Sequence, residues 1–402
     1  MRVGFVLLHP FTQSLASYVR VKELAISLKK LDVEPFIFTP YEKTQVMKEG
    51  IHIIHIPSIF SKWGIQSLFY QFSRRLYYSK ILQKFVIRLM EKKMKDTIGM
   101  FDLYELLKRY KLDVVQAEQD NAALLLLPLR DKLDIPIVLD LHGIWPEELV
   151  AAGTISEGSK EYATLQNIMQ HIVASVDLVV ALGEEMKRYL VSNYDSVSSK
   201  TVVASPGGRP RVKEIPQRPL PPKIIYAGTV TYRKHVDLFV KSMPFIRNSQ
   251  EKTTFFITRK GDLLLQIQKL AQQLHVSPEY FWFSNVNEMF EFMAQCHVGV
   301  LPTTNDTSSR ISMPSKLFDY FSVGLPVVVN EVGGWTEIIR ENKAGVLTAD
   351  DPKDFARGIL QLLDDPGMMA ECGKRGLDLL RRKYLWDNSA KILFNEYRKL
   401  LS

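Results

Sequence analysis

Short apolar runs and longer amphipathic segments alternate along most of the chain. Runs such as 3–8 and 114–117 have the length of buried strands, whereas residues 14–30 place apolar side chains at helical spacing. Strands that alternate with helices form parallel sheets covered by helices on both faces. The pattern therefore predicts an α/β fold, with further strands at 33–39, 51–56, 135–141, 178–181, 201–204, 224–227, 254–258, 281–284, 298–301 and 326–330.

The stretch IPQRPLPP at 215–222 interrupts this alternation. Proline-rich stretches are typical of connections between structured segments, and 402 residues exceed the usual size of one hydrophobic core. We therefore expect two Rossmann-like, doubly wound domains at 1–214 and 215–384, and a final helix at 385–402 that packs back on the first domain. Ligands of such sheets bind at the carboxyl ends of the strands, so the site is expected in a central cleft that the two domains face.

The segment MPSKLFDYFSVGLPVVVNEVGGWTEII at 313–339 carries the clearest local signal. Pro314 suits the first turn of a helix, and the β-branched run at 327–329 is typical of a buried parallel strand. Gly333 and Gly334 let the backbone approach a ligand, with free N–H groups at the next helix start. The segment therefore predicts two helix N-termini beside one strand end, which is a place to hold a diphosphate.

The composition narrows the class of protein. Apolar residues make up 46% and charged residues 24% of the chain, as in globular proteins. No apolar run reaches the roughly 18–20 residues that span a bilayer, and the apolar N-terminus lacks the cleavage site of a signal peptide. Cys296 and Cys372 have no metal-ligand spacing and cannot form a disulfide framework, which favours a reducing cytoplasm.

The net charge of +8 is concentrated in residues 62–100, where nine basic and two acidic side chains leave +7. The segment interleaves these charges with aromatic residues and has apolar residues at helical spacing on a separate face. Such a helix binds an anionic membrane surface; the alternative is an ordinary surface helix whose apolar face joins the core. Nucleic acid is not expected as a partner, because no recognition motif accompanies the charge.

Four motifs follow one another in the second half: YAGTVTYRKHVDLFVKSM at 226–243, HVGVLPT at 297–303, PSKLFDYFSVGLPVV from Pro314 and GGWTEII from Gly333. Together with DLHGIWPEELVAAG at 140–153, they make the chain resemble the retaining glycosyltransferases of family 4, in the bacterial branch that works on cell-surface polysaccharide and lipid-linked sugars. The resemblance implies the GT-B fold and hexosyl transfer from a nucleotide-diphospho-sugar to a lipid-linked or glycan acceptor. It implies no cofactor and no metal ion, and no DxD-like metal pair is evident.

The resemblance places the donor on the second domain. Lys234 stands where the family has a phosphate-binding lysine, with Arg233 beside it, and fixed cations stabilise charge on a leaving diphosphate. Ser315 and Lys316 open the predicted helix, where N–H groups, a hydroxyl and an ammonium would hold phosphate. Asp319 corresponds to the second glutamate of a family pair and would bind the ribose hydroxyls. Further donor-side candidates are Gly228, Thr229, Arg310, Gly333, Gly334 and Glu337.

Two positions depart from the family pattern: Thr229 replaces an arginine and Ile311 replaces the first glutamate. The role of the arginine could pass to Arg209, Arg233 or Lys316. The contacts to the sugar could pass to Ser309, Arg310 or Ser312. These departures leave a second hypothesis open, a non-catalytic relative that binds nucleotide sugar or partners a surface-polysaccharide transferase. A sugar-nucleotide epimerase of the same fold is a third, against which the PSK segment argues.

The first domain carries the remaining candidates. His142 follows a predicted strand and matches the family histidine that touches the donor sugar, although a lone histidine is more often structural. Asp140, Glu147 and Glu148 are nearby carboxylates, one of which would orient or deprotonate the acceptor hydroxyl. The predicted catalytic residues are His142, Lys234 and Asp140. The acceptor-side candidates are Ser14, Ser17 and Glu147. The resulting expectation is a cytoplasmic enzyme at the inner face of the cell membrane.

Overall fold

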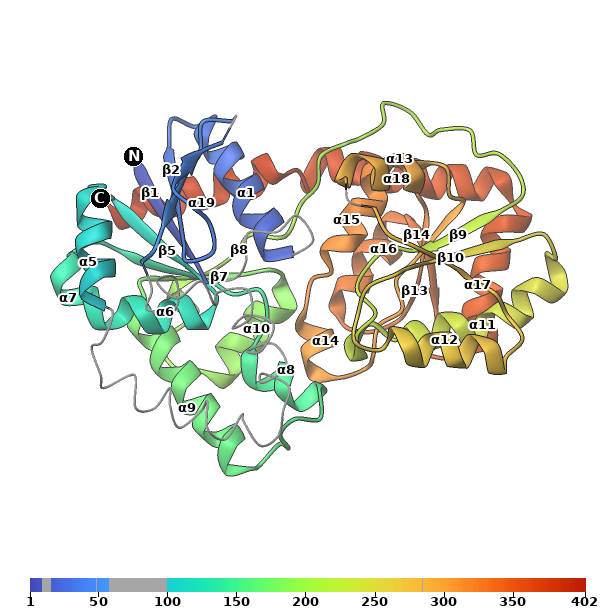
Figure 1. The fold of residues 1–402 in the computed structure, drawn as a ribbon, viewed down its shortest axis with the longest axis horizontal. Coiled ribbons are helices and arrows are strands. Elements are labelled where there is room, and N and C mark those ends of the chain that lie inside the picture. The colour runs from blue at the N-terminus through green and yellow to red at the C-terminus, as the bar shows by residue number, and fades with distance from the viewer. Residues whose placement is uncertain (9–15, 48, 58–99, 284) are drawn as a thin grey trace. The chain divides into compact units, whose positions relative to one another are not determined.

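The computed structural model describes residues 1–8, 16–47, 49–57, 100–283 and 285–402. The chain divides into two compact units, residues 1–205 with 386–402 and residues 206–385 (Figure 1). The predicted basic segment lies outside the described residues up to residue 99, and so does Ser14.

The described part of the first unit is built on an eight-stranded sheet with the order β3-β4-β2-β1-β5-β6-β7-β8. Its strand pairs are parallel apart from β3 with β4. Strands β5, β6 and β7 are buried throughout, because helices cover both faces of a parallel sheet. The strands are β1 (Arg2–Leu7), β2 (Glu34–Thr39), β3 (Gln45–Val46), β4 (His52–His55), β5 (Val114–Glu118), β6 (Ile137–Asp140), β7 (Leu178–Ala181) and β8 (Thr201–Val203).

The helices of this unit include the last helix of the chain. Helix α19 (Trp386–Leu400) packs against α1 (Ala16–Lys29), and Trp386, Leu393 and Tyr397 join the core of the first unit. The other helices are α5 (Met100–Arg109), α6 (Asp120–Leu126), α7 (Arg130–Leu133), α8 (Trp145–Ala151), α9 (Lys160–Ser175) and α10 (Glu184–Asn193), with 3-10 turns η1 (Leu127–Leu129) and η2 (Ser198–Lys200).

The second unit has a parallel six-stranded sheet, among its described residues, with the order β11-β10-β9-β12-β13-β14. Two apolar cores lie against it, one with α11, α12 and α17 and one with α13, α15, α16 and α18 (Figure 1). The strands are β9 (Lys223–Tyr226), β10 (Thr254–Thr258), β11 (Glu279–Phe281), β12 (Val298–Val300), β13 (Val327–Asn330) and β14 (Gly345–Thr348). The helices are α11 (Val236–Ser249), α12 (Leu264–Gln273), α13 (Val286–Ala294), α14 (Thr307–Ile311), α15 (Ser315–Ser322), α16 (Glu337–Asn342), α17 (Pro352–Asp364) and α18 (Pro366–Lys383), with η3 (Tyr232–Lys234) and η4 (Gly334–Thr336).

Each sheet starts near its centre and extends outward in both directions, so the strand order reverses between β1 and β5 and between β9 and β12. These reversals are the topological switch points at which doubly wound sheets bind ligands. The predicted fold class, α/β with two doubly wound parallel sheets, is therefore confirmed.

The structural division between the units precedes the predicted boundary at residues 214 and 215. Gly208 N donates to Tyr384 O at 2.9 Å, and Arg211 N donates to Ser322 O at 2.8 Å. These backbone bonds tie the segment after residue 205 to the second unit. The proline-rich stretch lies wholly inside this unit, where Arg218 Nη2 donates to Gly324 O at 2.7 Å.

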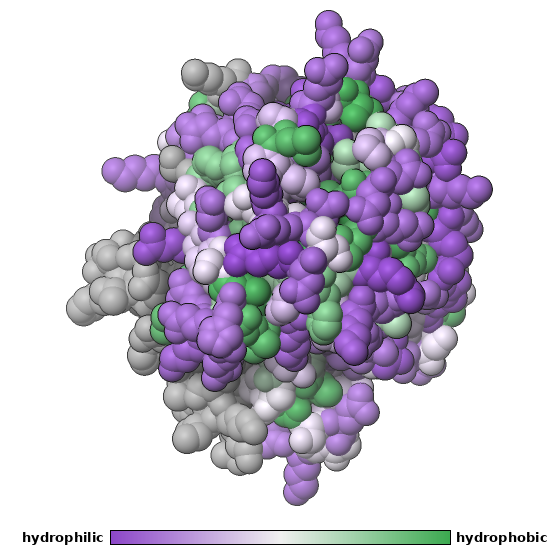
Figure 2. Space-filling view, turned by 90° about the vertical axis from the view of Figure 1, so that its right-hand side faces the viewer, coloured by the Kyte–Doolittle hydropathy of each residue, from purple (hydrophilic) through white to green (hydrophobic). Residues whose placement is uncertain are grey.

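The surface in Figure 2 is mostly hydrophilic, with hydrophobic residues in small groups among the polar ones. Across the part of the chain that the structure describes, no helix is both long enough and apolar enough to span a bilayer.

Candidate functional site

The loop after β9 stands at the switch point of the second unit and is held by hydrogen bonds to its neighbours. The hydroxyl of Tyr320 accepts from Ala227 N at 2.9 Å and donates to Val300 O at 3.1 Å, so α15 is tied to β9 and β12. Gly228 N donates to Thr258 Oγ1 at 2.8 Å. The backbone at this strand end is therefore fixed before any ligand binds.

Lys316, in the first turn of α15, buries its ammonium against this loop. Nζ lies 4.0 Å from the ring centroid of Tyr226 and has no hydrogen-bond partner among the described residues. A Cβ on Gly228 would lie 2.0 Å from Nζ, so the ammonium sits directly against that glycine. Burial, followed by the charge of Lys234, lowers the pKa of Lys316 well below its usual range, while Asp319 opposes the shift. A buried ammonium without a hydrogen-bond partner is costly even with the Asp319 charge nearby, and this place therefore favours an anion.

Arg233 and Lys234 belong to the 3-10 turn η3, which leads into α11. Arg233 Nη1 donates to Ser308 Oγ at 2.7 Å, and Arg233 O accepts from Thr304 Oγ1 at 3.3 Å. The charge of Lys234 reaches Lys316 strongly enough to lower its pKa. Two lysines from separate elements, predicted from the sequence as phosphate ligands, thus lie near each other at one end of the sheet.

Asp319 lies one helical turn after Ser315, the first residue of α15. Burial raises the pKa of the Asp319 carboxyl to about 6, while the charges of Lys316 and then Arg211 act against this shift. Helix α15 thus brings a carboxyl, an ammonium, a hydroxyl and free N–H groups to the same switch point. The helix begins at Ser315 with Pro314 as its N-cap, one residue after the predicted start at Pro314.

Gly333 and Gly334 were predicted to let the backbone approach a ligand, but Gly333 lies against another part of the chain. Gly333 has φ of +73°, and a Cβ there would lie 2.4 Å from Arg310 O. The close approach that requires glycine is therefore to the chain's own α14 backbone. Gly334 is the first residue of η4, which precedes α16. The side chain of Arg310 is exposed. The side chain of Glu337 is 52% exposed, and its carboxylate lies 3.2 Å from Arg340 Nε.

The switch point of the first unit carries a buried group of charges. Asp140, the last residue of β6, accepts from Arg20 Nε at 2.8 Å and from Arg20 Nη2 at 3.1 Å. Asp140 is fully buried and Arg20 is 3% exposed. The predicted role of Asp140 in orienting or deprotonating an acceptor does not fit this position, because its carboxylate is enclosed in a bidentate ion pair.

His142 joins this group from the loop after β6. Its Nε2 lies 3.0 Å from Glu118 Oε2 and 3.9 Å from Asp140 Oδ2. Burial and then Asp140 raise the pKa of Glu118, against the opposing effects of His142 and Gln116. The Glu118, Asp140 and His142 atoms lie within 4.8 Å of one another, a spacing that could hold a metal ion. The Arg20 guanidinium already neutralises Asp140 there, and its repulsion disfavours a second cation.

Sequence reasoning missed Glu118 and Arg20. Arg20 lies on the buried face of α1, whose neighbours Val21, Leu24 and Leu28 are apolar. A basic residue within an apolar stripe, and an acidic residue at the end of an apolar strand, are the signals that could have found the pair.

Two acceptor-side candidates, Glu147 and Ser17, are among the described residues. Glu147 is 2% exposed, and its Oε1 accepts from Tyr162 at 2.7 Å, Tyr189 at 2.6 Å and Gln166 at 3.1 Å. A carboxylate enclosed by three donors braces α8 against α9 and α10, which does not fit the prediction that Glu147 meets an acceptor. Ser17 is half-buried in the first turn of α1.

His142 and Lys234 belong to different units. The second unit brings together Gly228, Lys234, Ser315, Lys316 and Asp319, and the first brings His142 to Asp140. That these two groups line one cleft stays a prediction.

Comparison with known proteins gives two family matches that together cover most of the chain. Residues 19–208 match the model described as glycosyltransferase family 4, and residues 221–365 match the model described as glycosyl transferases group 1. An uncharacterized glycosyltransferase of Methanocaldococcus jannaschii is 26% identical over 178 residues, which cover 44% of this chain and 44% of that relative.

Solved structures resemble the whole chain. Sucrose-phosphate synthase from Thermosynechococcus elongatus has a TM-score of 0.75 at 15% identity, over 99% of this chain and 98% of that one. HepE from Anabaena, solved with UDP and glucose, has a TM-score of 0.68 at 11% identity, over 99% of both chains. These matches confirm the predicted family and fold. The chain therefore belongs to the family-4 glycosyltransferases, with the GT-B fold.

Proposed function

We propose that the protein is a retaining glycosyltransferase that moves a sugar from a nucleotide-diphospho-sugar to a hydroxyl acceptor, lipid-linked or on a polysaccharide. The observation that carries this proposal is the buried Lys316 ammonium, which has no hydrogen-bond partner among the described residues. A diphosphate at this strand end would pair with Lys316 and Lys234 and would supply the hydrogen-bond acceptor that the Lys316 ammonium lacks among the described residues.

The cations would act when the bond between the sugar and the diphosphate breaks. Negative charge then grows on the leaving phosphate oxygen, and fixed cations stabilise it without reorganisation. The free N–H groups at the start of α15 add to this effect, because a helix N-terminus carries a partial positive charge. Retention and independence from a metal ion follow the family resemblance, with the two lysines and Arg233 in place of the metal.

The first unit would serve the reacting sugar through His142. We propose His142 as the residue that touches the donor sugar, with the buried Glu118 beside its ring. Asp140 and Arg20 would then act as positioning residues, since both are enclosed. The HepE structure with UDP and glucose supports a nucleotide-sugar donor for this fold.

A donor screen on the purified protein tests the proposal. Release of nucleoside diphosphate would be measured from UDP-, GDP-, ADP- and dTDP-sugars, with and without a membrane lipid extract. We expect release from one donor, raised by the extract and strongly lowered by Lys316→Met. Lys374→Met makes the same change at an exposed position of α18 and should leave release unchanged. Equal release by the Lys316→Met and wild-type proteins would contradict the assignment.

A second candidate function is favoured by Ile311 and Thr229, which replace a glutamate and an arginine of the family. Ile311 is 7% exposed and offers no polar group to a sugar. A non-catalytic protein that binds nucleotide sugar, or partners a surface-polysaccharide transferase, would be stabilised thermally by one nucleotide without releasing product from any donor.

A further inference from the structure

The turn that carries Lys234 ends at His235, which has a left-handed backbone with φ of +42°. A residue with a Cβ is disfavoured in this conformation. Non-glycine residues keep it only where the surroundings hold them, and they concentrate at functional sites. The contacts of the His235 side chain are therefore informative.

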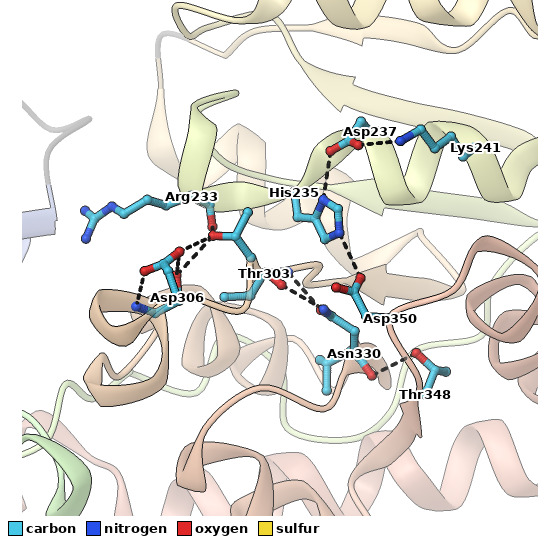
Figure 3. Close-up of polar contacts among 12 residues, drawn as sticks. Arg233, His235, Asp237, Lys241, Thr303, Asp306, Asn330, Thr348 and Asp350 are labelled. Atoms are coloured by element: carbon cyan, nitrogen blue, oxygen red, sulfur yellow. Dashed lines mark hydrogen bonds and ion pairs between the residues drawn. The ribbon is translucent and has the colours of Figure 1, made fainter. Parts of the chain in front are cut away.

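Both ring nitrogens of His235 contact carboxylates (Figure 3). Nδ1 lies 2.8 Å from Asp237 Oδ1, and Nε2 lies 2.8 Å from Asp350 Oδ1. Asp237 Oδ2 also accepts from Lys241 Nζ at 2.8 Å. Only the protonated imidazolium can donate to both carboxylates at once.

Asp350 reaches His235 from a rigid support. It precedes α17, whose N-cap Asp351 accepts from the backbone N of Lys353 and of Asp354, both at 2.9 Å. Ala349 N donates to Asp354 Oδ2 at 2.6 Å. The carboxylate that holds His235 is thus fixed by a capped helix start.

The other side of the turn is fixed as well. Arg233 contacts Thr304 and Ser308, and Asp306 caps α14 by accepting from Ser309 N at 2.9 Å. Lys234 therefore lies between two anchored residues, Arg233 on one side and His235 on the other.

We propose that His235 is a positioning residue whose imidazolium, clamped between Asp237 and Asp350, fixes the turn that presents Lys234 to the diphosphate of the donor. Donor binding then weakens when the imidazolium loses its proton. This inference rests on the proposed function, and it concerns the regulation of the same site by pH.

The direction of the pH effect follows from the groups around the ring. Burial lowers the pKa of His235, but the hydrogen bonds and charges of Asp237 and Asp350 together raise it above its ordinary value. Asp237 and Lys241 face the ring from α11, Asp350 faces it from the loop before α17, and Arg233 and Lys234 lie in its own turn. The clamp is complete below the ordinary histidine pKa and is lost as pH rises through the raised one. A neutral ring keeps one N–H and releases one carboxylate.

Two substitutions separate the clamp from the backbone conformation. His235→Ala removes the ring and keeps a Cβ in the disfavoured conformation, and we expect it to weaken nucleoside diphosphate binding about tenfold. His235→Gly removes the ring but adopts positive φ freely, and it should bind within about threefold of the wild type at pH 8.5. His275 offers a matched control, because it has φ of +54° and no carboxylate contact among the described residues. His275→Ala should bind like the wild type.

Binding of UDP, GDP, ADP and dTDP would be measured by calorimetry from pH 6 to pH 9, and the His235 ring would be titrated by NMR without ligand. We expect a ring pKa above the ordinary value and a loss of affinity with rising pH that is smaller in His235→Gly. Any pH dependence of the affinity that the wild type and His235→Gly share is assigned to Lys316 and to the phosphates of the nucleotide. A ring that titrates below the ordinary value, or a His235→Ala protein that is folded and has the wild-type pH profile, overturns the inference. If the wild type binds none of the four nucleotides, the proposed function fails instead.

Discussion

The two switch points of this molecule carry charge in opposite ways. In the first unit, Arg20 and Asp140 form a buried ion pair, and Glu118 lies against His142. In the second unit, Lys316 is buried beside another lysine, with no hydrogen-bond partner among the described residues. The charges of the first group face partners of the opposite sign, although Arg20 Nη1 has no hydrogen-bond partner among the described residues, whereas the buried ammonium of the second group favours an anion. We therefore expect the same fold position to serve stability in the first unit and anion binding in the second.

The largest expected effect is on turnover, from the removal of the unpaired cation. Lys316→Met should lower the rate of nucleoside diphosphate release by roughly 100-fold to 1,000-fold, because a charge-stabilising donor in a dry site contributes this much. The Tm should be unchanged or higher, since the substitution removes a buried ammonium that has no hydrogen-bond partner among the described residues. A fall in Tm as large as the fall in rate would show that Lys316 is part of the scaffold.

Removal of one charge from the first unit should act on stability. Arg20→Met leaves Asp140 buried and unpaired, which should cost about 3–5 kcal/mol in the free energy of unfolding measured with urea. The double substitution Arg20→Met with Asp140→Leu should recover most of this loss, because it removes both charges. If Arg20→Met were as stable as the wild type, water would replace Arg20 as the partner of Asp140 without loss of stability. Nucleotide binding by the folded variant should persist, since its lysines belong to the other unit.

The sheets were predictable because they depend on local pattern, whereas the role of the two lysines rests mainly on the family resemblance and stays a prediction. Apolar runs of strand length alternate with helices, and Pro314 marks the start of the helix that carries Lys316 in its first turn. The strand β3 was missed because it is two residues long and exposed, and the single apolar side chain of Val46 makes no run of strand length. The domain boundary was misplaced because backbone bonds to residues far along the chain hold the segment after residue 205.

The polar groups around the site were less predictable, since their partners are distant in sequence. Arg20 and Asp140 are 120 positions apart, and His235 and Asp350 are 115 apart. Spacing within one helix or strand cannot pair such residues. The predictions for Asp140, at the end of β6, and for Glu147, in α8, therefore could not show that both carboxylates are enclosed.

A smaller effect concerns protons taken up with the ligand. The lowered pKa of Lys316 means that the unliganded protein becomes more stable as pH rises through this pKa toward the value of the unfolded chain. A bound diphosphate favours the ammonium and raises its pKa again, so binding should take up a proton at pH values between the two. Calorimetry in buffers of different ionisation enthalpy measures this uptake. It should vanish in Lys316→Met and persist in Lys374→Met; equal uptake in both would assign the proton to another group.

The smallest expected effect is on kcat/KM, and it tests whether the Glu337 carboxylate of the second unit takes part in binding beside the cations. Glu337 follows the glycine pair and could contact the sugar or brace the loop, and the structure pairs it with the exposed Arg340. Exposed pairs of this kind contribute little because solvent screens them. Glu337→Gln should therefore change kcat/KM by no more than about twofold, since the solvated pair lies outside any buried anion site. A loss of tenfold or more in kcat with an unchanged Tm would place Glu337 on the sugar, and the second unit would then combine cations for the diphosphate with an anion for the hydroxyls.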